Sequence, residues 1–256
     1  MHHYLLFTIA KYSLLEAFRD RIFILIILGN IILFSISLFV GELAIAEREQ
    51  TQVAILAFII RLFSIFIISL FVITSILREF NDKGFELILS HSVTRASYYL
   101  GKILGFSIIA LLIALLSSIA LISFSPIETI FLWGTSLYLE LLIVINLSML
   151  CLISFNSITI SFIVVVAFYF LCRSIEVIQL ISNSPIMALG STSHQFINFC
   201  IDLIAKLLPN LNQFTRTEWL VYGVDGNQIV MILGQTVIYS ILLSCFALFD
   251  FYRKEL

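Results

Sequence analysis

The sequence predicts an all-α integral membrane protein that crosses the bilayer six times. Of its 256 residues, 61% are hydrophobic and only 12% are charged, and the mean hydropathy is +1.12. A water-soluble domain is nearer half apolar and a quarter charged, so apolar surface in this excess must face lipid. The apolar residues are also grouped into runs of about 20, the length that an α-helix needs to cross the hydrocarbon core.

Residues 1–21 precede the first run and predict a helix that lies along the cytoplasmic membrane interface. At 100° per residue its apolar side chains gather on one side, although Lys11 and Tyr12 interrupt the pattern. We expect an interfacial helix rather than a cytosolic tail. The apolar side would consist of Leu6, Phe7, Ala10, Leu14, Ala17 and Phe18.

Two of the six expected spans have to be separated from one another. An uncharged run extends from Leu141 to Cys172, which is too long for one span, and its only turn-forming cluster is Ser154–Ser157. We therefore place a tight hairpin there. The expected spans are residues 22–40, 53–77, 103–124, 130–155, 158–180 and 228–250.

The distribution of lysine and arginine predicts the orientation. With both termini in the cytoplasm, nine of the 14 basic residues lie on the cytoplasmic side and four lie outside, at Arg48, Arg173, Lys206 and Arg216. Because positive charge favours the cytoplasmic side, we expect this orientation in the cytoplasmic (inner) cell membrane. The cytoplasmic residues would be Lys11, Arg19, Arg21, Arg78, Lys83, Arg95, Lys102, Arg253 and Lys254.

Two connections are too long to be simple turns. Residues 78–102 form the one sizeable cytoplasmic loop, where charged side chains alternate with Phe, Leu and Ile, and they predict a short surface helix. Residues 181–227 form an extracytoplasmic segment before the last span. Its part from 195 to 208 predicts a helix that stops at Pro209 and rests on the outer membrane face.

The sequence lacks the common patterns of catalytic and metal sites. It has no HExxH motif and no phosphate-binding G-x4-G-K-[ST] motif, since Gly101-Lys102 is followed by Ile103. The four cysteines form no CxxC pair, and the net charge of −2 gives no indication of a nucleic-acid partner. We expect no enzymatic activity, metal or cofactor on this chain, and no nucleic acid among its partners.

Two ionisable residues fall inside expected spans. Arg61 lies eight residues into the second span and Glu140 ten residues into the fourth, which places both about 12–15 Å from the outer helix ends. A charge at the bilayer centre costs about 2.5–3.5 kcal/mol on insertion scales. The matching depth predicts an ion pair, either fixing helix packing or lining a transport path.

The 78–102 loop contains a set of residues at characteristic positions. It consists of Glu79 after the second span, then Gly84, Leu87-Ile-Leu-Ser90, Arg95 and Gly101-Lys102 opening the third span. This pattern resembles the corresponding stretch of ABC-2-type permeases, the membrane subunits of type-2 ABC exporters, and is closest in style to nitrous-oxide-reductase maturation permeases. Ser92 stands where that family commonly has proline, so we expect a less sharp turn here than is usual in the family.

The resemblance covers the whole chain in layout and about 25 residues in motif. It implies a cytoplasmic coupling helix within residues 79–90 that sits in a groove of a separate ATPase subunit, which would bind ATP and Mg²⁺. A second permease chain, identical or closely related, would complete the assembly in the lipid membrane. The residues implied in coupling are Glu79, Phe80, Asp82, Lys83, Gly84, Phe85, Glu86, Leu87 and Arg95.

The predicted function is therefore a transmembrane permease subunit of an ATP-driven exporter. Few polar residues interrupt the spans, which favours an amphipathic or lipid-like cargo. One alternative is an ATP-independent secondary transporter that uses Arg61 and Glu140, and another is a membrane scaffold without transport. Spans broken by Gly or Pro would favour the secondary transporter, but the three prolines, at 126, 185 and 209, lie outside the spans.

Overall fold

The computed structural model describes residues 2–43, 48–81, 94–182, 192–215 and 226–253. Within these ranges the chain forms eight α-helices and one 3₁₀ turn, without strands. Six helices are long and apolar enough to cross a membrane, so the predicted six-span fold is confirmed and the chain is a multi-pass membrane protein. They are α2 (Ile22–Leu43), α3 (Arg48–Asn81), α5 (Arg95–Ile119), α6 (Ile127–Phe155), α7 (Ile158–Ser182) and α10 (Gly226–Arg253).

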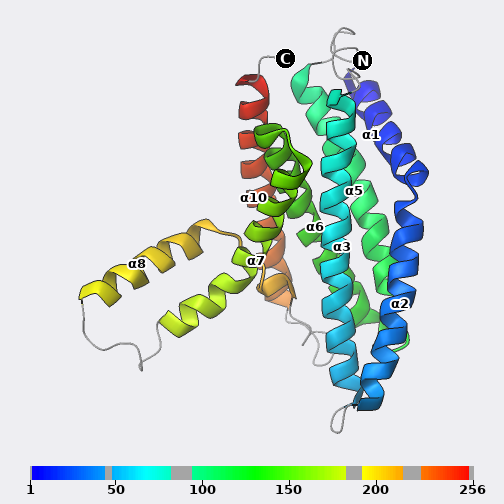
Figure 1. Cartoon of the computed structure of the whole chain (residues 1–256), viewed down its shortest axis with the longest axis vertical. Coiled ribbons are helices and arrows are strands. Elements are labelled where there is room, and N and C mark those ends of the chain that lie inside the picture. The colour runs from blue at the N-terminus through cyan, green and yellow to red at the C-terminus, as the bar shows by residue number, and fades with distance from the viewer. Residues whose placement is uncertain (1, 44–47, 82–93, 183–191, 216–225, 254–256) are drawn as a thin grey trace.

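The spans form a bundle around α6 (Figure 1). In its most apolar stretch, 78% of the residues of α6 are buried, against 17% for α10. Helices α3, α5, α7 and α10 all contact α6, and α2 packs on α3. The first residues of α1 (His2–Arg19) and the last of α10 lie at the same end of the bundle, which we call the terminal end; the opposite end is the distal end.

The helix ends differ from those predicted around the 78–102 loop. Helix α3 continues to Asn81 and α5 begins at Arg95, so the connection is shorter at both ends. The apolar run begins only at Ile103, but the helix starts earlier because Thr94 caps it, accepting a hydrogen bond from the Ser97 amide at 3.2 Å. Residues 82–93, with most of the expected coupling helix, lie outside the described residues.

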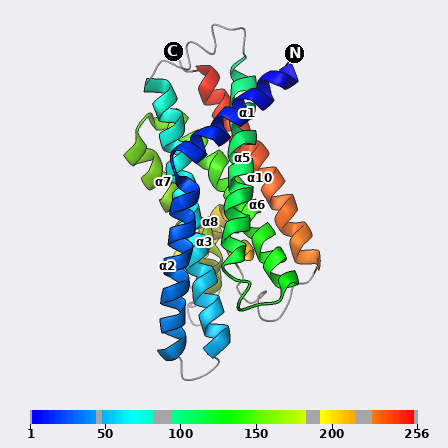
Figure 2. The same ribbon diagram turned by 90° about the vertical axis from the view of Figure 1, so that its right-hand side faces the viewer.

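Helix α1 crosses α5 obliquely at the terminal end (Figure 2). Small residues make the crossing close: Ala10 and Ser13 of α1 face Gly105, where a Cβ atom would lie 2.8 Å from the Cβ of Ser13. The expected apolar side of α1 is therefore divided. Ala10 and Ala17 are buried against the bundle, whereas Phe7 and Phe18 point away from it and are exposed.

A single left-handed residue makes the hairpin between α6 and α7. Asn156 has φ 52°, a conformation that Asn tolerates better than most residues, and its amide donates to the Leu152 carbonyl at 2.9 Å. Helix α6 thus ends at Phe155 and α7 begins at Ile158. The hairpin predicted at Ser154–Ser157 is confirmed.

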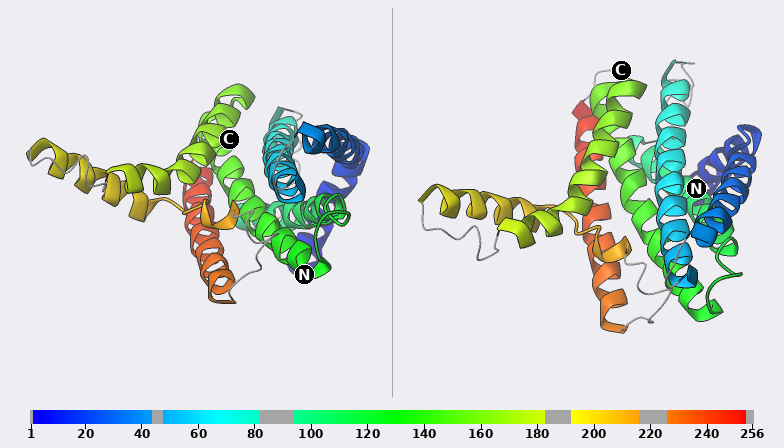
Figure 3. Two further views of the ribbon diagram at one scale, coloured as in Figure 1. Left: turned by 90° about the horizontal axis from the view of Figure 1, so that it is seen from below. Right: turned by 60° about the horizontal axis from the view of Figure 1, so that its bottom comes forward.

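The last part of α7 and helix α8 (Thr192–Leu207) project sideways from the bundle (Figures 1 and 3). Polar contacts join the two: Gln179 donates to Asp202 at 2.7 Å, and Ser182 bonds Asn198. Helix α8 ends just before Pro209, as predicted. The chain then returns to the bundle at η1 (Gln213–Thr215), where Phe214 is buried.

The close crossing of α1 and α5 can be tested at Gly105. We expect Gly105→Val to destabilise the detergent-solubilised protein by about 1–3 kcal/mol, because the added side chain would meet the Ala10 backbone, 3.1 Å from the Cβ position. Thermal unfolding would measure the loss. Gly234→Val is the matched control, because nothing lies within 4 Å of its Cβ position; equal losses in both variants would contradict the packing described.

Candidate functional site

Buried charge in the described residues gathers in two places. One is at the terminal end, where Glu16, Asp20, Arg78, Glu79 and Lys102 meet; we call it the terminal network. The other is inside the bundle around the Arg61–Glu140 ion pair, and we call it the central network. Together they contain every ion pair found between described residues.

Lys102 is the centre of the terminal network. Its side chain, only 3% exposed, forms an ion pair with Glu79 of α3, and its Nζ lies 3.8 Å from Oε2 of Glu16 in α1. Tyr98, one turn earlier on α5, donates its hydroxyl proton to the same Glu79 carboxylate. Ser75 of α3 donates to Glu16 at 2.7 Å. Three helices, α1, α3 and α5, are thereby held together by charge-assisted contacts.

Arg78 extends this network toward solvent. Its Nη1 lies 3.2 Å from Oδ2 of Asp20, at the junction of α1 and α2, and 3.8 Å from Oε1 of Glu16. Because Arg78 is 45% exposed, these outer pairs contribute little stability compared with the buried Lys102 contacts.

Arg95 connects the start of α5 to the end of α10. Its Nη1 donates to the backbone carbonyl oxygens of Phe251 at 2.7 Å and Tyr252 at 3.3 Å. Carbonyl groups in the last turn of a helix have no partner within the helix, so an arginine there satisfies them and opposes the helix dipole. The guanidinium carbon also lies 5.8 Å from the centre of the Phe251 ring.

These contacts change the interpretation of the residues implied in coupling. Glu79 and Arg95 form bonds within the chain, and Phe80 lies against Phe251 with ring centroids 6.5 Å apart. These three therefore anchor the two ends of the 82–93 segment to the bundle. The other six, Asp82, Lys83, Gly84, Phe85, Glu86 and Leu87, lie outside the described residues, and their role stays a prediction.

We expect Lys102→Met to loosen α1, because Glu79 would lose its buried cation and Glu16 would keep only the distant, half-exposed Arg78. A cost of about 1–3 kcal/mol is usual for a buried charged group that loses its partner. Hydrogen exchange should become faster in α1 while that of α7 stays unchanged. Lys11→Met is the control, since Lys11 is exposed on α1; unchanged protection of α1 in Lys102→Met would show that the network does not hold this helix.

Arg61 and Glu140 form an ion pair, as their matching depth predicted. The distance from Nη1 to Oε2 is 2.6 Å, and the two side chains are 1% and 0% exposed. Each residue lies thirteen positions after the start of its helix, α3 or α6, so the pair is about 20 Å from those ends rather than 12–15 Å. The difference arises because both helices begin before their apolar runs.

Neighbouring helices complete the central network. Tyr169 of α7 donates to Oε1 of Glu140 at 3.0 Å, and its hydroxyl accepts from Nη1 of Arg173 at 3.0 Å. Ser136 accepts from Arg61 at 3.4 Å and donates to the Phe214 carbonyl of η1. The pair thus joins α3, α6, α7 and the segment that returns from α8.

Two members of this network were not predicted from the sequence. Arg173 was expected outside the membrane although it falls within the expected span 158–180, and it lies half-buried within α7; nothing indicated Tyr169. Their spacing of four residues was the available signal, since residues i and i+4 share a helix face. The face that α7 turns toward α6 could not be known before the helices were placed.

The central network has the chemistry of packing and charge recognition rather than of bond cleavage. Among the described residues, no group of three or more His, Cys, Asp and Glu side chains could hold a metal ion. Three buried donors have no hydrogen-bond partner there, namely Nε and Nη2 of Arg61 and Nε1 of Trp133, whose ring lies 5.0 Å from the Arg61 guanidinium carbon.

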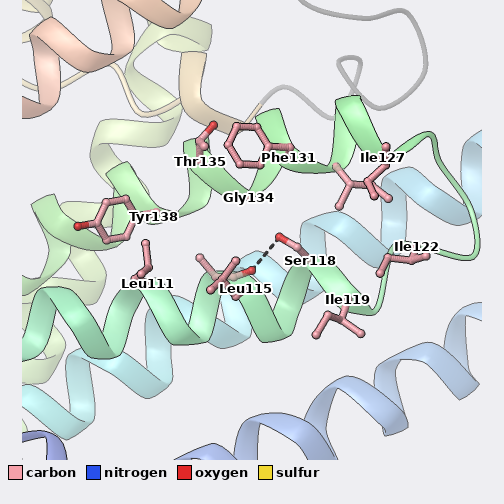
Figure 4. A pocket seen from close by; sticks show the side chains of 12 residues that line it. Leu111, Leu115, Ser118, Ile119, Ile122, Ile127, Phe131, Gly134, Thr135 and Tyr138 are labelled. Atoms are coloured by element: carbon pink, nitrogen blue, oxygen red, sulfur yellow. Dashed lines mark hydrogen bonds between the residues drawn. The ribbon is translucent and has the colours of Figure 1, made fainter.

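An apolar pocket of about 330 Å³ lies between α5 and α6 near their distal ends (Figure 4). Three hydroxyl side chains line it, those of Ser118, Thr135 and Tyr138. Two of them bond within their own helices: Ser118 donates to the Ala114 carbonyl and Thr135 to the Leu132 carbonyl, both at 2.8 Å. The remaining lining is apolar or aromatic, including Leu115, so the pocket suits hydrocarbon and offers no site for an ion.

The central pair can be tested with a mutant cycle. Glu140→Gln leaves the Arg61 charge buried without its partner, which we expect to cost about 3–5 kcal/mol of stability. The double variant Arg61→Met, Glu140→Gln should recover at least half of that loss in thermal unfolding. Tyr169→Phe, which keeps the pair but removes a hydroxyl bonded to two charged groups, should cost less, about 1.5–3 kcal/mol. Additive losses from the two single substitutions would show that the residues do not interact.

Comparisons with protein-family models and with curated proteins find no match to this chain. The observations that bear on its function are the residue pattern of the 78–102 segment and the terminal and central networks, in which membrane helices contact one another through charged side chains.

Proposed function

We propose that this chain is the membrane subunit of an ATP-driven exporter, with a separate ATPase bound to the segment between α3 and α5. The observation that carries the proposal is the anchoring of both ends of residues 82–93. Glu79 ties the end of α3 to Lys102 of α5, next to Glu16 of α1, and Arg95 ties the start of α5 to the end of α10. A force on this segment would reach α1 and the second, third and last spans (α3, α5 and α10) at once.

The sequence pattern of the segment supports the same function. Glu79, Gly84, Arg95 and Gly101-Lys102 resemble the pattern of ABC-2-type permeases, and Glu79, Arg95 and Lys102 each make a contact that joins two helices. Gly101 lets Ile9 of α1 approach to 3.0 Å from its Cβ position. Gly101 thus allows α1 to cross close to α5, and Lys102, which follows it, pairs with Glu79.

In this mechanism the terminal end faces the cytoplasm, as the distribution of basic residues favours. The ATPase would then meet the segment on the side where ATP is available. Closure of two ATPases around ATP would move α3 and α5 together, because Lys102 and Tyr98 both hold Glu79. A second permease chain would face the first, and an amphipathic cargo would move between them.

The alternative function is an ATP-independent carrier that uses Arg61 and Glu140. The observation in its favour is the set of bonds around the pair, in which Tyr169 and Arg173 extend the network across α7. The enclosure of the pair counts against it, since carriers need water or substrate to reach their charged residues. Transport driven by a proton gradient without ATPase would favour this alternative.

The coupling role can be tested by charge reversal. When the chain is co-expressed with an ATPase subunit encoded next to it, we expect Glu86→Lys to abolish co-purification of that ATPase without lowering the thermal stability of the chain. Glu79→Lys should lower stability as well, because Glu79 pairs with Lys102. Arg253→Glu is the control at the terminal end. If as much ATPase co-purifies with Glu86→Lys as with the native chain, the proposed contact is contradicted.

A further inference from the structure

Arg173 has no acidic partner within the described residues. It donates Nη1 to Tyr169 at 3.0 Å, and its guanidinium carbon lies 4.6 Å from the centre of the Phe58 ring. Glu140 pairs with Arg61, and Glu176, three residues after Arg173 on α7, accepts a hydrogen bond from Asn212 at 3.0 Å. Arg173 therefore forms no direct ion pair with a described carboxylate and meets Glu140 only through the Tyr169 hydroxyl.

The position of Arg173 makes this charge costly. It lies fifteen residues after the start of α7, about 22 Å along a helix long and apolar enough to span the membrane. An arginine near the membrane surface can lower the cost by extending its side chain to water. Arg173 instead turns one turn back along α7 to Tyr169 and across to Phe58 of α3, so it is held in place between the two helices.

Aromatic side chains border this position on the outside of the bundle. Phe58 of α3 and Phe170 of α7 are 39% and 43% exposed. Phe66 lies between the helices, with its ring centroid 6.3 Å from that of Phe170 and 6.4 Å from that of Phe162. We call Phe58, Phe66, Phe162 and Phe170 the aromatic seam. Because exposed residues of a span face hydrocarbon, a ligand at Arg173 would arrive from the lipid rather than from water.

We propose that Arg173 binds the acidic head group of an amphiphile, a carboxylate or a phosphate, whose apolar chain lies along the aromatic seam. A guanidinium can bind such a group through two parallel hydrogen bonds, and Arg173 uses only one nitrogen within the described chain. Beyond Tyr169, Arg61 is ion-paired with Glu140, but its Nε and Nη2 are donors without a hydrogen-bond partner. This inference deepens the proposed function by naming the substrate class, and it rests on that function only for the transport step.

The test uses the full chain in phosphatidylcholine nanodiscs, without ATPase. A fatty acid that carries a diazirine in mid-chain is photocrosslinked to the protein, and the labelled peptides are identified by mass spectrometry. We expect saturable labelling of the α3 and α7 peptides that contain the aromatic seam. Oleate should compete for it, whereas oleyl alcohol, which has the same chain without the charge, should not.

Variants then assign the effect to the guanidinium. Arg173→Gln should raise the half-saturating concentration at least about tenfold, the size expected when a hydrogen bond to a charged group is lost. Arg173→Lys should retain part of the binding, and Arg253→Gln, which removes an exposed arginine at the terminal end, should leave it unchanged.

Three results would overturn the inference: competition by oleyl alcohol as strong as by oleate, labelling outside α3 and α7, or competition by inorganic phosphate alone. The first would indicate ordinary lipid contact and the last a simple anion site. The competition experiments with oleate and oleyl alcohol use only the native chain, so they test the proposal even if a variant fails to fold. Because no ATPase is present in this experiment, a negative result would contradict amphiphile binding at Arg173 without bearing on the ATPase-binding test of the proposed function.

Discussion

The structure depends on one constraint: a charged group that leaves water inside this bundle needs a partner within the protein, and the buried ion-paired groups find theirs on another helix. Hydrocarbon offers no hydrogen bonds, so the partner has to come from protein. Lys102 satisfies this requirement with Glu79 and Glu16, and Arg61 does so with Glu140. The apolar side chains keep the helices in the membrane, but lipid-facing apolar surface alone is compatible with many arrangements of the helices. The charged contacts are specific to one arrangement, because each requires two particular faces to meet.

Helix α3 belongs to both networks. Arg61 lies near its middle and Glu79 near its end, eighteen residues later, so α3 connects the contacts with α6 and α7 to those with α1 and α5. A displacement of the end of α3 would thus be carried to Tyr169 and Arg173 through a continuous helix and its hydrogen bonds. The segment proposed to receive the ATPase and the position proposed to receive the amphiphile are joined by this one element.

Depth in the membrane could be predicted from the sequence, whereas the direction in which a side chain points could not. Hydropathy gave six spans, and the turn at Asn156 followed from the one polar cluster in a long apolar run. The Arg61–Glu140 pair followed from equal depth on parallel helices. By contrast, the partners of Lys102 and Arg173 depend on which faces of α5 and α7 turn inward, and neighbouring helices decide that. The start of α5 was missed because its polar first turns are not part of an apolar run, although Thr94 was available as a capping residue.

The hydrogen bonds from Arg95 to the carbonyl groups of Phe251 and Tyr252 join residues 156 and 157 positions apart. During synthesis, the contacts of Lys102 with Glu16 and Glu79 can form as soon as α5 is made, since all three residues precede its end. Arg95 has to wait until the final helix has left the ribosome and entered the bilayer. A chain that stops before α10 could therefore form the Lys102 contacts but not the bonds that Arg95 makes with Phe251 and Tyr252.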